Sequence, residues 1–242
     1  MICTTPRPVK ENSLVFVSKT ITNTDATTGN QCKKWVLLTA NSPIGKHMSD
    51  IILASSSKYR ASLLSRLGLP FITVSPNIDE TALKEESPVA TAERLSLKKA
   101  SEISKKYLNV PVIGADQVAE LDGQPINKPN SFEQAYSQLT RQSGKKVLFH
   151  SGIAVVFRND QRRVHQYSGV NTTTVKFRTL NNEQIRSYLS KEDSLDCAGS
   201  FKVEGLGVSL FKSIENNDPT SLMGLPIIDL CKMLRLFDID IP

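Results

Sequence analysis

The feature that most constrains the fold of this chain is an alternation that begins at Ile51. Short apolar runs of strand length recur from there on, and segments with helical periodicity separate them. The pattern predicts buried strands at Ile51–Ala54, Phe71–Val74 and Val110–Ala115, with helices near Ser57–Leu67 and Pro88–Tyr107 between them. Strands that alternate with helices favour an α/β architecture in which helices cover the faces of the sheet.

The second half of the chain adds antiparallel strands to this pattern. Two long strand-like runs, Val147–Phe157 and Val164–Phe177, flank a polar turn at Asn159–Asp160 and predict a hairpin. The sheet should therefore be mixed, with flanking helices. The remaining expected elements are helices near Phe132–Arg141, Asn182–Ser190 and Pro226–Leu236, and a glycine-rich stretch from Ala198 to Val208.

Residues 1–48 differ in composition from the rest of the chain. They are rich in Thr, Ser and Asn, and they show no sustained helical period. Leu14–Val17 and Trp35–Leu38 could each form a short strand, so a packed accessory hairpin is one alternative. We expect residues 1–48 to be an N-terminal extension, poorly ordered or accessory, and residues 49–242 to be the folded domain.

The net charge of +6 is compatible with a nucleic-acid partner, so the location of the charge matters. Residues 1–48 hold six basic and two acidic residues and account for +4 of the total. In the remainder, lysines are interleaved with acids, as in Lys84-Glu85-Glu86, which is typical of a solvated surface. We therefore expect no nucleic-acid partner.

The chain lacks the sequence signals of membrane insertion and of secretion. No apolar run approaches the roughly 20 residues that cross a bilayer, and the N-terminus lacks the layout of a secretory signal. The expected location is cytoplasmic, with no membrane partner. Reduced thiols are expected rather than a zinc site or disulfides, because the four cysteines lie far apart. They are Cys3, Cys32, Cys197 and Cys231.

The segment from Ser55 to Arg60, between the first expected strand and helix, has the composition of an anion site. Backbone N–H groups at a helix start attract anions, and serine hydroxyls add donors. Arg60 shares the inward helix face with Leu63 and Leu64, where a guanidinium suits bidentate phosphate binding. The alternative is a serine N-cap followed by an arginine that reaches water past an apolar surface.

The periodicity of the long helix singles out Lys99. This lysine falls between Leu95 and Ile103 at four-residue steps, whereas its neighbour Lys98 aligns with charged residues on the solvent face. An inward-facing cation needs an anionic partner. The alternative is a lysine whose stem packs inside while its ammonium group reaches water.

Two acidic positions follow expected strands. Asp116 ends the apolar run Val112–Ala115, and ligands of open α/β sheets sit beyond the carboxyl ends of strands. A carboxylate there can hold a metal or accept a proton from water. Asp79-Glu80 follows the second expected strand. Taken singly, each position is also compatible with a turn or a loop surface.

Together with Lys128, these residues form a coherent set. Its members are Ser55, Arg60, Glu80, Lys99, Asp116 and Lys128. Cations that bind phosphates, beside acids that hold a metal and activate water, are what triphosphate hydrolysis requires. The residue types alone leave open whether the bond cleaved is the one between the α and β phosphorus or the terminal one.

Six motifs occur in order between Ile51 and Leu236. They are Ile-Leu-Ala-Ser-Ser-Ser-Lys-Tyr-Arg60, Asp79-Glu80-Thr, Leu95-Ser-Leu-Lys-Lys99-Ala, Gly114-Ala-Asp-Gln117, Asn127-Lys-Pro129, and Cys197-Ala-Gly-Ser-Phe-Lys-Val-Glu-Gly205. In this combination the chain resembles the Maf family, the septum-formation-inhibitor-like nucleotide pyrophosphatases. The resemblance implies a mixed sheet in two lobes around a central cleft, similar to inosine triphosphatase, and commonly a homodimer.

The resemblance also implies roles for the residues. Asp116 would accept the proton of the attacking water, and pyrophosphate would leave after cleavage between the α and β phosphorus. Asp116 and Glu80 would hold a divalent cation, Mg²⁺, Mn²⁺ or Co²⁺. The phosphates would be contacted by Ser55, Arg60, Lys99 and Lys128. Asn127 departs from the family pattern, because it stands where glycine usually precedes the Lys-Pro pair.

Three further positions sort substrates within the family, and here they are Tyr59, Gln117 and Glu204. The combination resembles the subgroup that acts on 7-methyl-GTP. A 7-methylguanine ring is positively charged, so an aromatic face attracts it, and a carboxylate can accept from its N1–H and 2-amino groups. From the residues alone, a packed tyrosine, a polar glutamine and a glutamate at a turn remain open.

Two alternatives stand beside a 7-methyl-GTP pyrophosphatase. One is a pyrophosphatase for dTTP, UTP or other modified nucleotides, because Tyr59 stands where the 7-methyl-GTP subgroup can carry tryptophan. The other is a nucleotide-binding regulator of cell division with little catalysis. A binder has no need of a carboxylate such as Asp116 beside its phosphate site, and this favours an enzyme.

Overall fold

The computed structural model of the chain describes residues 51–241, and these residues form a mixed sheet. The strand order is β2-β1-β3-β5-β6-β7, and β4 pairs with β3 beside this path. β1 is parallel to β2 and β3, and the other pairings are antiparallel. The expected α/β fold with a mixed sheet is confirmed. The strands are β1 (Ile51–Ala54), β2 (Phe71–Thr73), β3 (Val112–Leu121), β4 (Gln124–Ile126), β5 (Lys146–Arg158), β6 (Val164–Phe177) and β7 (Phe211–Glu215).

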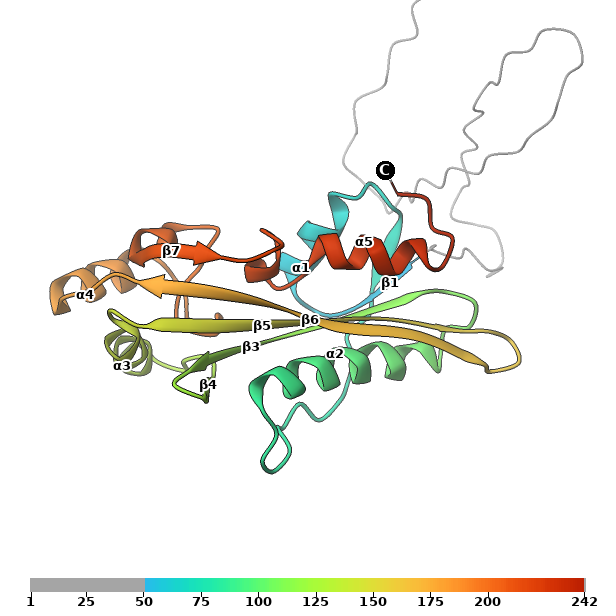
Figure 1. Cartoon of the computed structure of the whole chain (residues 1–242), viewed down its shortest axis with the longest axis horizontal. Coiled ribbons are helices and arrows are strands. Elements are labelled where there is room, and N and C mark those ends of the chain that lie inside the picture. Colours follow the sequence, from blue (N-terminus) through green and yellow to red (C-terminus); the bar gives the residue numbers. More distant parts are fainter. Residues whose placement is uncertain (1–50, 242) are drawn as a thin grey trace, which may run out of the picture. The chain divides into compact units, whose positions relative to one another are not determined.

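Helices cover both faces of the sheet at one end (Figure 1). On one face α2 (Pro88–Ser104) buries Ala100 and Ile103 against Ile52 and Val112. The opposite face packs Leu and Ile side chains against α1 (Lys58–Ser65) and α5 (Ile227–Arg235). Alternate residues of β1 thus enter two separate cores, as the period of two along a strand requires.

The other end of the sheet forms a second lobe. There α3 (Phe132–Gln142) and α4 (Asn182–Lys191) pack with β4 and β7, and a third core surrounds Phe149 and Phe201. Strands β3, β5 and β6 run through both lobes, with β5 and β6 paired continuously from Lys146 to Arg158. The expected two-lobed arrangement is therefore confirmed.

The helix starts follow the capping residues of the sequence. Ser57, Ser87 and Ser131 each accept a backbone N–H three residues ahead, and Asn181 forms a reciprocal capping box with Gln184. Within residues 51–241, no helix is long and apolar enough to cross a membrane.

One expected strand end was wrong. The strand predicted to stop at Ala115 continues to Leu121, so Asp116 lies inside β3 and not at its carboxyl end. The cause is β5, which pairs with β3 from Val112 to Glu120 and supports it beyond the end of β1 at Ala54.

Two strands were not expected from the sequence. β4 has three residues and includes Pro125, and β7 has five residues with no regular burial pattern. Neither carries the alternation of apolar and polar residues that identifies a strand. The predicted extension, residues 1–48, lies outside the described residues.

Candidate active site

A cleft of about 1330 Å³ is lined by residues of both lobes. It lies at an interruption in the pairing along one edge of β3. β1 pairs with β3 as far as Gly114, β4 pairs with β3 from Ala119 onward, and neither pairs with the residues between. Asp116 and Gln117 point to opposite faces of the sheet, yet both line the cleft because this stretch of edge is open.

All nine residues that the sequence singled out line this one cleft. They are Ser55, Tyr59, Arg60, Glu80, Lys99, Asp116, Gln117, Lys128 and Glu204. Ser55, Lys99 and Asp116 are buried, whereas Lys128 and Glu204 are exposed.

A buried cation between two acids forms the centre of the site. Lys99 Nζ donates to Asp116 Oδ1 at 2.7 Å and to Glu80 Oε2 at 2.8 Å. The Lys99 side chain is only 7% exposed, and Asp116 is 10% exposed. The inward orientation expected for Lys99 is thus present, and its anionic partners are the two acids of the predicted set. Lys99 and Asp116 are 17 residues apart in the sequence, and they meet because α2 packs on β3.

Two glycines allow α2 to pack that closely. A Cβ atom at Gly114 would lie 2.0 Å from the carbonyl oxygen of Ser96, and one at Gly152 would lie 2.1 Å from that of Ala92. Both obstacles are helix backbone, so neither can move aside cheaply. Gly152 is the direct cross-strand partner of Asp116. The sheet surface beneath α2 is therefore flat beside Asp116, and this brings Lys99 within reach of Asp116.

Glu80 is held in place by the residues that flank it. Arg94 donates to the carbonyl oxygen of Thr81 at 3.1 Å, and Lys98 donates to that of Asp79 at 2.8 Å. Arg94 also forms a two-point ion pair with Glu86. The solvent-facing cations of α2 thus fasten this loop to the helix, so that the Glu80 carboxylate meets Lys99.

The electrostatic surroundings of Asp116 suit a base. Burial raises the pKa of this carboxyl group, the nearby charge of Glu80 adds to the rise, and Lys99 and Arg60 oppose it. A carboxylate with a raised pKa takes up a proton more readily than an ordinary aspartate. The two neighbouring cations, Lys99 and Arg60, act in the opposite direction and favour the ionised form.

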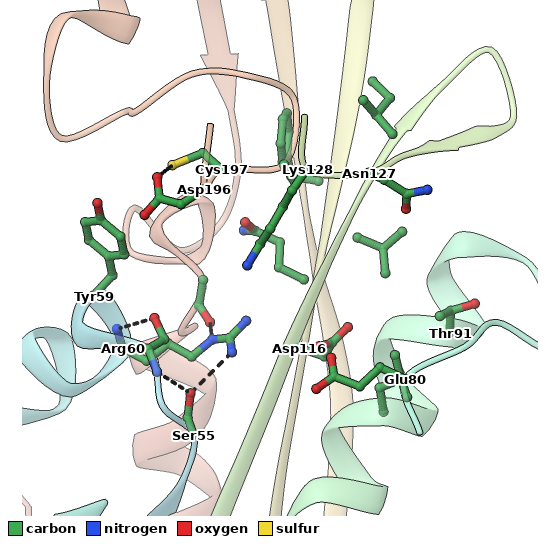
Figure 2. Close-up of a pocket in the computed structure, with 18 of the residues that line it drawn as sticks. Ser55, Tyr59, Arg60, Glu80, Thr91, Asp116, Asn127, Lys128, Asp196 and Cys197 are labelled. Carbon is green, nitrogen blue, oxygen red and sulfur yellow. Dashed lines mark hydrogen bonds between the residues drawn. The ribbon is translucent and has the colours of Figure 1, made fainter. Parts of the chain in front are cut away.

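Arg60 is oriented by main-chain and serine oxygens (Figure 2). Its Nε donates to the carbonyl oxygen of Gly224 at 2.9 Å, and its Nη1 donates to Ser55 Oγ at 3.4 Å. Burial lowers the pKa of Arg60, but a guanidinium group stays charged in proteins. The guanidinium is therefore a fixed positive charge at the wall of the cleft.

Gln117 is fixed by three acceptors around its amide nitrogen. Its Nε2 donates to Ser151 Oγ at 2.9 Å and to the carbonyl oxygens of Ser221 and Leu222 at 3.1 Å each. These acceptors define the orientation of the amide, so its carbonyl oxygen is the atom left for a ligand.

The segment from Asp218 to Gly224 thus orients both Gln117 and Arg60, and it was not expected from the sequence. The buried carboxylate of Asp218 holds the segment, accepting from the backbone N–H groups of Thr220 and Ile228. The contacts to the site come from main-chain carbonyl groups, which carry no residue-specific signal.

Asp196 and Cys197 also line the cleft, close to Tyr59, and were missed as site residues (Figure 2). Partial burial and the charge of Asp196 raise the pKa of Tyr59. Burial and a hydrogen bond to Asp196 raise the pKa of Cys197 to about 12. The thiol is therefore protonated at neutral pH.

The acids available for a metal are few. Within residues 51–241, no three His, Cys, Asp or Glu side chains gather as a ready metal cluster. Asp116 and Glu80 present two carboxylates that converge on one cation, the Lys99 ammonium group. Two hard oxygen donors suit Mg²⁺ or Mn²⁺, provided that substrate phosphates complete the coordination.

A mixed α/β sheet with a cleft of this composition defines a class of enzymes that act on polyphosphate compounds. A model of the Maf-like protein family matches residues 50–237, and the chain belongs to the Maf family. The resemblance inferred from the sequence is confirmed, and with it the enzyme class, a nucleotide pyrophosphatase.

Similar proteins agree with this membership. The chain is 47% identical over 195 residues to a 7-methyl-GTP pyrophosphatase of Xanthomonas axonopodis pv. citri, covering 81% of this chain and 100% of that one. It is 47% identical over 190 residues to a 7-methyl-GTP pyrophosphatase of Bordetella avium, covering 78% and 94%. A solved structure, the Ham1 protein of Staphylococcus aureus, matches with a TM-score of 0.41 at 15% identity, covering 78% of this chain and 99% of that one.

Proposed function

We propose that this chain hydrolyses 7-methyl-GTP to 7-methyl-GMP and pyrophosphate. The observation that carries the proposal is that two sets of residues line one cleft. We assign the phosphates to the part around Lys99, Asp116 and Glu80, which we call the phosphate end. We assign the base to Tyr59, Gln117 and Glu204, which we call the base end. The relatives named 7-methyl-GTP pyrophosphatase, at 47% identity, support the same substrate.

At the phosphate end, the groups are suited to attack by water on the α phosphorus. Asp116 accepts the proton of that water, and pyrophosphate leaves when the bond between the α and β phosphorus breaks. Arg60, Lys99 and Lys128 offset the charge that develops on the leaving group. Ser55 adds a hydroxyl group, and its oxygen already contacts Arg60.

The residues fit a divalent cation, and Asp116 with Glu80 would hold it. A bound Mg²⁺, Mn²⁺ or Co²⁺ neutralises phosphate charge and polarises the phosphoryl oxygens. Lys99 then orients both carboxylates, which accept hydrogen bonds from its ammonium group at 2.7 and 2.8 Å.

At the base end, the groups suit a methylated guanine. The free carbonyl oxygen of Gln117 and the carboxylate of Glu204 are acceptors, and guanine offers its N1–H and 2-amino groups as donors. The ring of Tyr59, 37% exposed, gives the positive base an aromatic face. A pyrimidine such as thymine or uracil carries no positive charge and has carbonyl groups on both sides of its single N–H.

The test is pyrophosphate release from 7-methyl-GTP, GTP, dTTP and UTP, each with Mg²⁺, Mn²⁺ or Co²⁺. We expect 7-methyl-GTP to be the preferred substrate. A preference for dTTP or UTP would retain the reaction and overturn the assignment of the base end. Release of orthophosphate without an added inorganic pyrophosphatase would overturn the point of cleavage. Turnover of no nucleotide would favour a nucleotide-binding regulator.

Three further expectations belong to the proposal. Residues 49–242 are the catalytic domain and residues 1–48 an extension, so a chain starting at Met48 should keep full turnover.

The enzyme works as a homodimer, which light scattering on the purified chain would detect. Its location is the cytoplasm, which fractionation of cells would establish.

A further inference from the structure

Asp196 lies in the cleft, away from the catalytic cluster. It precedes the glycine-rich segment, and Figure 2 draws it beside Tyr59 and Cys197, apart from Asp116 and Glu80. Its side chain is 59% exposed. An exposed carboxylate on a cleft wall is available to a ligand, and no step described above uses it.

The charge of Asp196 is only loosely compensated. The Lys202 ammonium group lies 3.7 Å from its Oδ1, which is ion-pair distance and too long for a hydrogen bond. Cys197 donates a weak S–H bond to the same oxygen at 3.2 Å. The charge of Lys202 also acts on the Tyr59 hydroxyl group, where it opposes the rise in the pKa of Tyr59, so Asp196 is not its only neighbour.

The cleft wall around Tyr59 carries charges of both signs. Asp196 and Glu204 contribute two carboxylates, Lys58 contributes an ammonium group, and the Lys202 ammonium group lies 3.7 Å from Asp196. Asp196 is thus an exposed carboxylate with no close ion pair. Such a carboxylate attracts a cationic ring, whereas a neutral base gains nothing from its charge.

We propose that Asp196 is a further specificity-determining residue, which attracts a positively charged purine base, and that Lys202 opposes it. The inference rests on the proposed function, because it concerns the choice between a cationic and a neutral base at the same site. It adds a through-space charge contribution to the direct hydrogen bonds of Gln117 and Glu204.

The test compares kcat/KM for 7-methyl-GTP and for GTP, which differ in the charge of the base. Asp196→Asn should lower the ratio about three- to tenfold, the size expected for one charge near a solvated ligand, because its effect on the triphosphate is common to both nucleotides and cancels in the ratio. Lys202→Met should raise the ratio by a similar factor. Opposite signs are decisive, because damage to the loop would lower activity in both variants without regard to the charge of the base.

Two control variants isolate the effect of charge. Asp193→Asn removes an exposed carboxylate three residues away that does not line the cleft, and it should leave the ratio unchanged. Tyr59→Phe removes the hydroxyl group that Lys202 contacts but keeps the aromatic face. If Tyr59→Phe reproduced the effect of Lys202→Met, the ammonium charge would not be the cause, and the role of Lys202 would be overturned.

Ionic strength gives an independent readout. The difference between the wild type and Asp196→Asn should shrink as salt is raised from 0.05 to roughly 0.5 M, because screening weakens a through-space attraction. A ratio that is unchanged in Asp196→Asn, in an enzyme that still prefers 7-methyl-GTP, would overturn this inference and leave the proposed function intact. An enzyme with no preference for 7-methyl-GTP would instead overturn the proposed function.

Discussion

The two ends of the cleft are built differently. The centre of the phosphate end is buried and lies on regular elements: Lys99 on α2 and Asp116 inside β3, joined by a 2.7 Å contact. The two carboxylates at the base end, Glu204 and Asp196, lie on exposed loops, and Asp196 is held by a 3.7 Å ion pair. Under the proposed function, the proton acceptor therefore stands on the rigid scaffold, and the acids that distinguish one base from another stand on loops.

The comparison leads to a rule for substitutions. Changes at the phosphate end should lower turnover of every nucleotide, because they remove groups that act on the reacting atoms. Changes at the base end should alter the ratio between nucleotides and leave the turnover of a poor substrate nearly unchanged. The four predictions below test this rule, beginning with the largest effect.

Asp116→Asn should cause the largest loss. The amide keeps the shape of the side chain but cannot accept the proton of water, so we expect kcat to fall about 10³-fold for 7-methyl-GTP and GTP alike. Steady-state pyrophosphate release measures the loss. Asp122→Asn, an exposed change in the turn after the same strand, is the matched control and should retain full activity. A loss of turnover for only one of the two nucleotides would contradict the rule that changes at the phosphate end affect every nucleotide.

Lys99→Met should lower kcat about 10²-fold and also change the pH profile. Asp116 must be ionised to act as a base, so kcat/KM falls as pH falls through its pKa. Burial raises that pKa and Lys99 opposes the rise, so removing the ammonium group should move the acid limb to higher pH. An acid limb at the wild-type pH would contradict the assignment of that limb to Asp116.

Gly114→Ala should act on the phosphate end without touching a charged group. The added Cβ atom meets the carbonyl oxygen of Ser96 at 2.0 Å, so α2 must shift and carry Lys99 away from Asp116. We expect kcat to fall roughly 10- to 100-fold and the protein to lose about 1–3 kcal/mol of stability. Gly169→Ala is the matched control, since its nearest neighbour would be the end of Met233 at 3.6 Å. Equal kinetics in the two variants would refute the role of the close approach.

Glu204→Gln should have the smallest effect of the four substitutions, and it should alter the preference among nucleotides rather than the turnover of all of them. The amide removes a charge-assisted acceptor for the guanine edge, so kcat/KM for 7-methyl-GTP should fall about tenfold. Turnover of dTTP should stay near its wild-type level. A uniform fall for all four nucleotides would show that Glu204 supports the loop rather than the choice of base.

The sequence predicted the phosphate end in more detail than the base end, for a physical reason. Lys99 stands out because a helix repeats every 3.6 residues, and a cation at an apolar position violates that pattern. Asp116 stands out because it follows an unbroken apolar run. Loops have no repeat, so the exposed Asp196 and the loosely paired Lys202 carry no comparable signal. Of the base-end residues, Tyr59, Gln117 and Glu204 were reached through the family resemblance alone.

Tertiary contacts account for what the sequence did not predict. The extension of β3 beyond Ala115 depends on pairing with β5, whose partner residues lie 36 to 28 positions away, from the Asp116–Gly152 pair to the Glu120–Leu148 pair. The support of Gln117 and Arg60 by the carbonyl groups of Ser221 and Gly224 depends on backbone oxygens, which every residue carries. Only the positive φ of Gly224, 96°, favours a particular residue there. Side-chain patterns cannot reveal contacts of either kind.

The continuity of β3, β5 and β6 through both lobes has a mechanical consequence. Two lobes that are joined only by single linkers can rotate about a hinge. Here three paired strands continue through both lobes, and a continuous sheet of this kind bends only slightly. We therefore expect opening and closing at this cleft to take place in its rim, in the segments around Lys128 and Glu204, since the Glu80 segment is held to α2. A conformational change during turnover should be a movement of these loops over a fixed floor, and not a rotation of one half of the folded domain against the other.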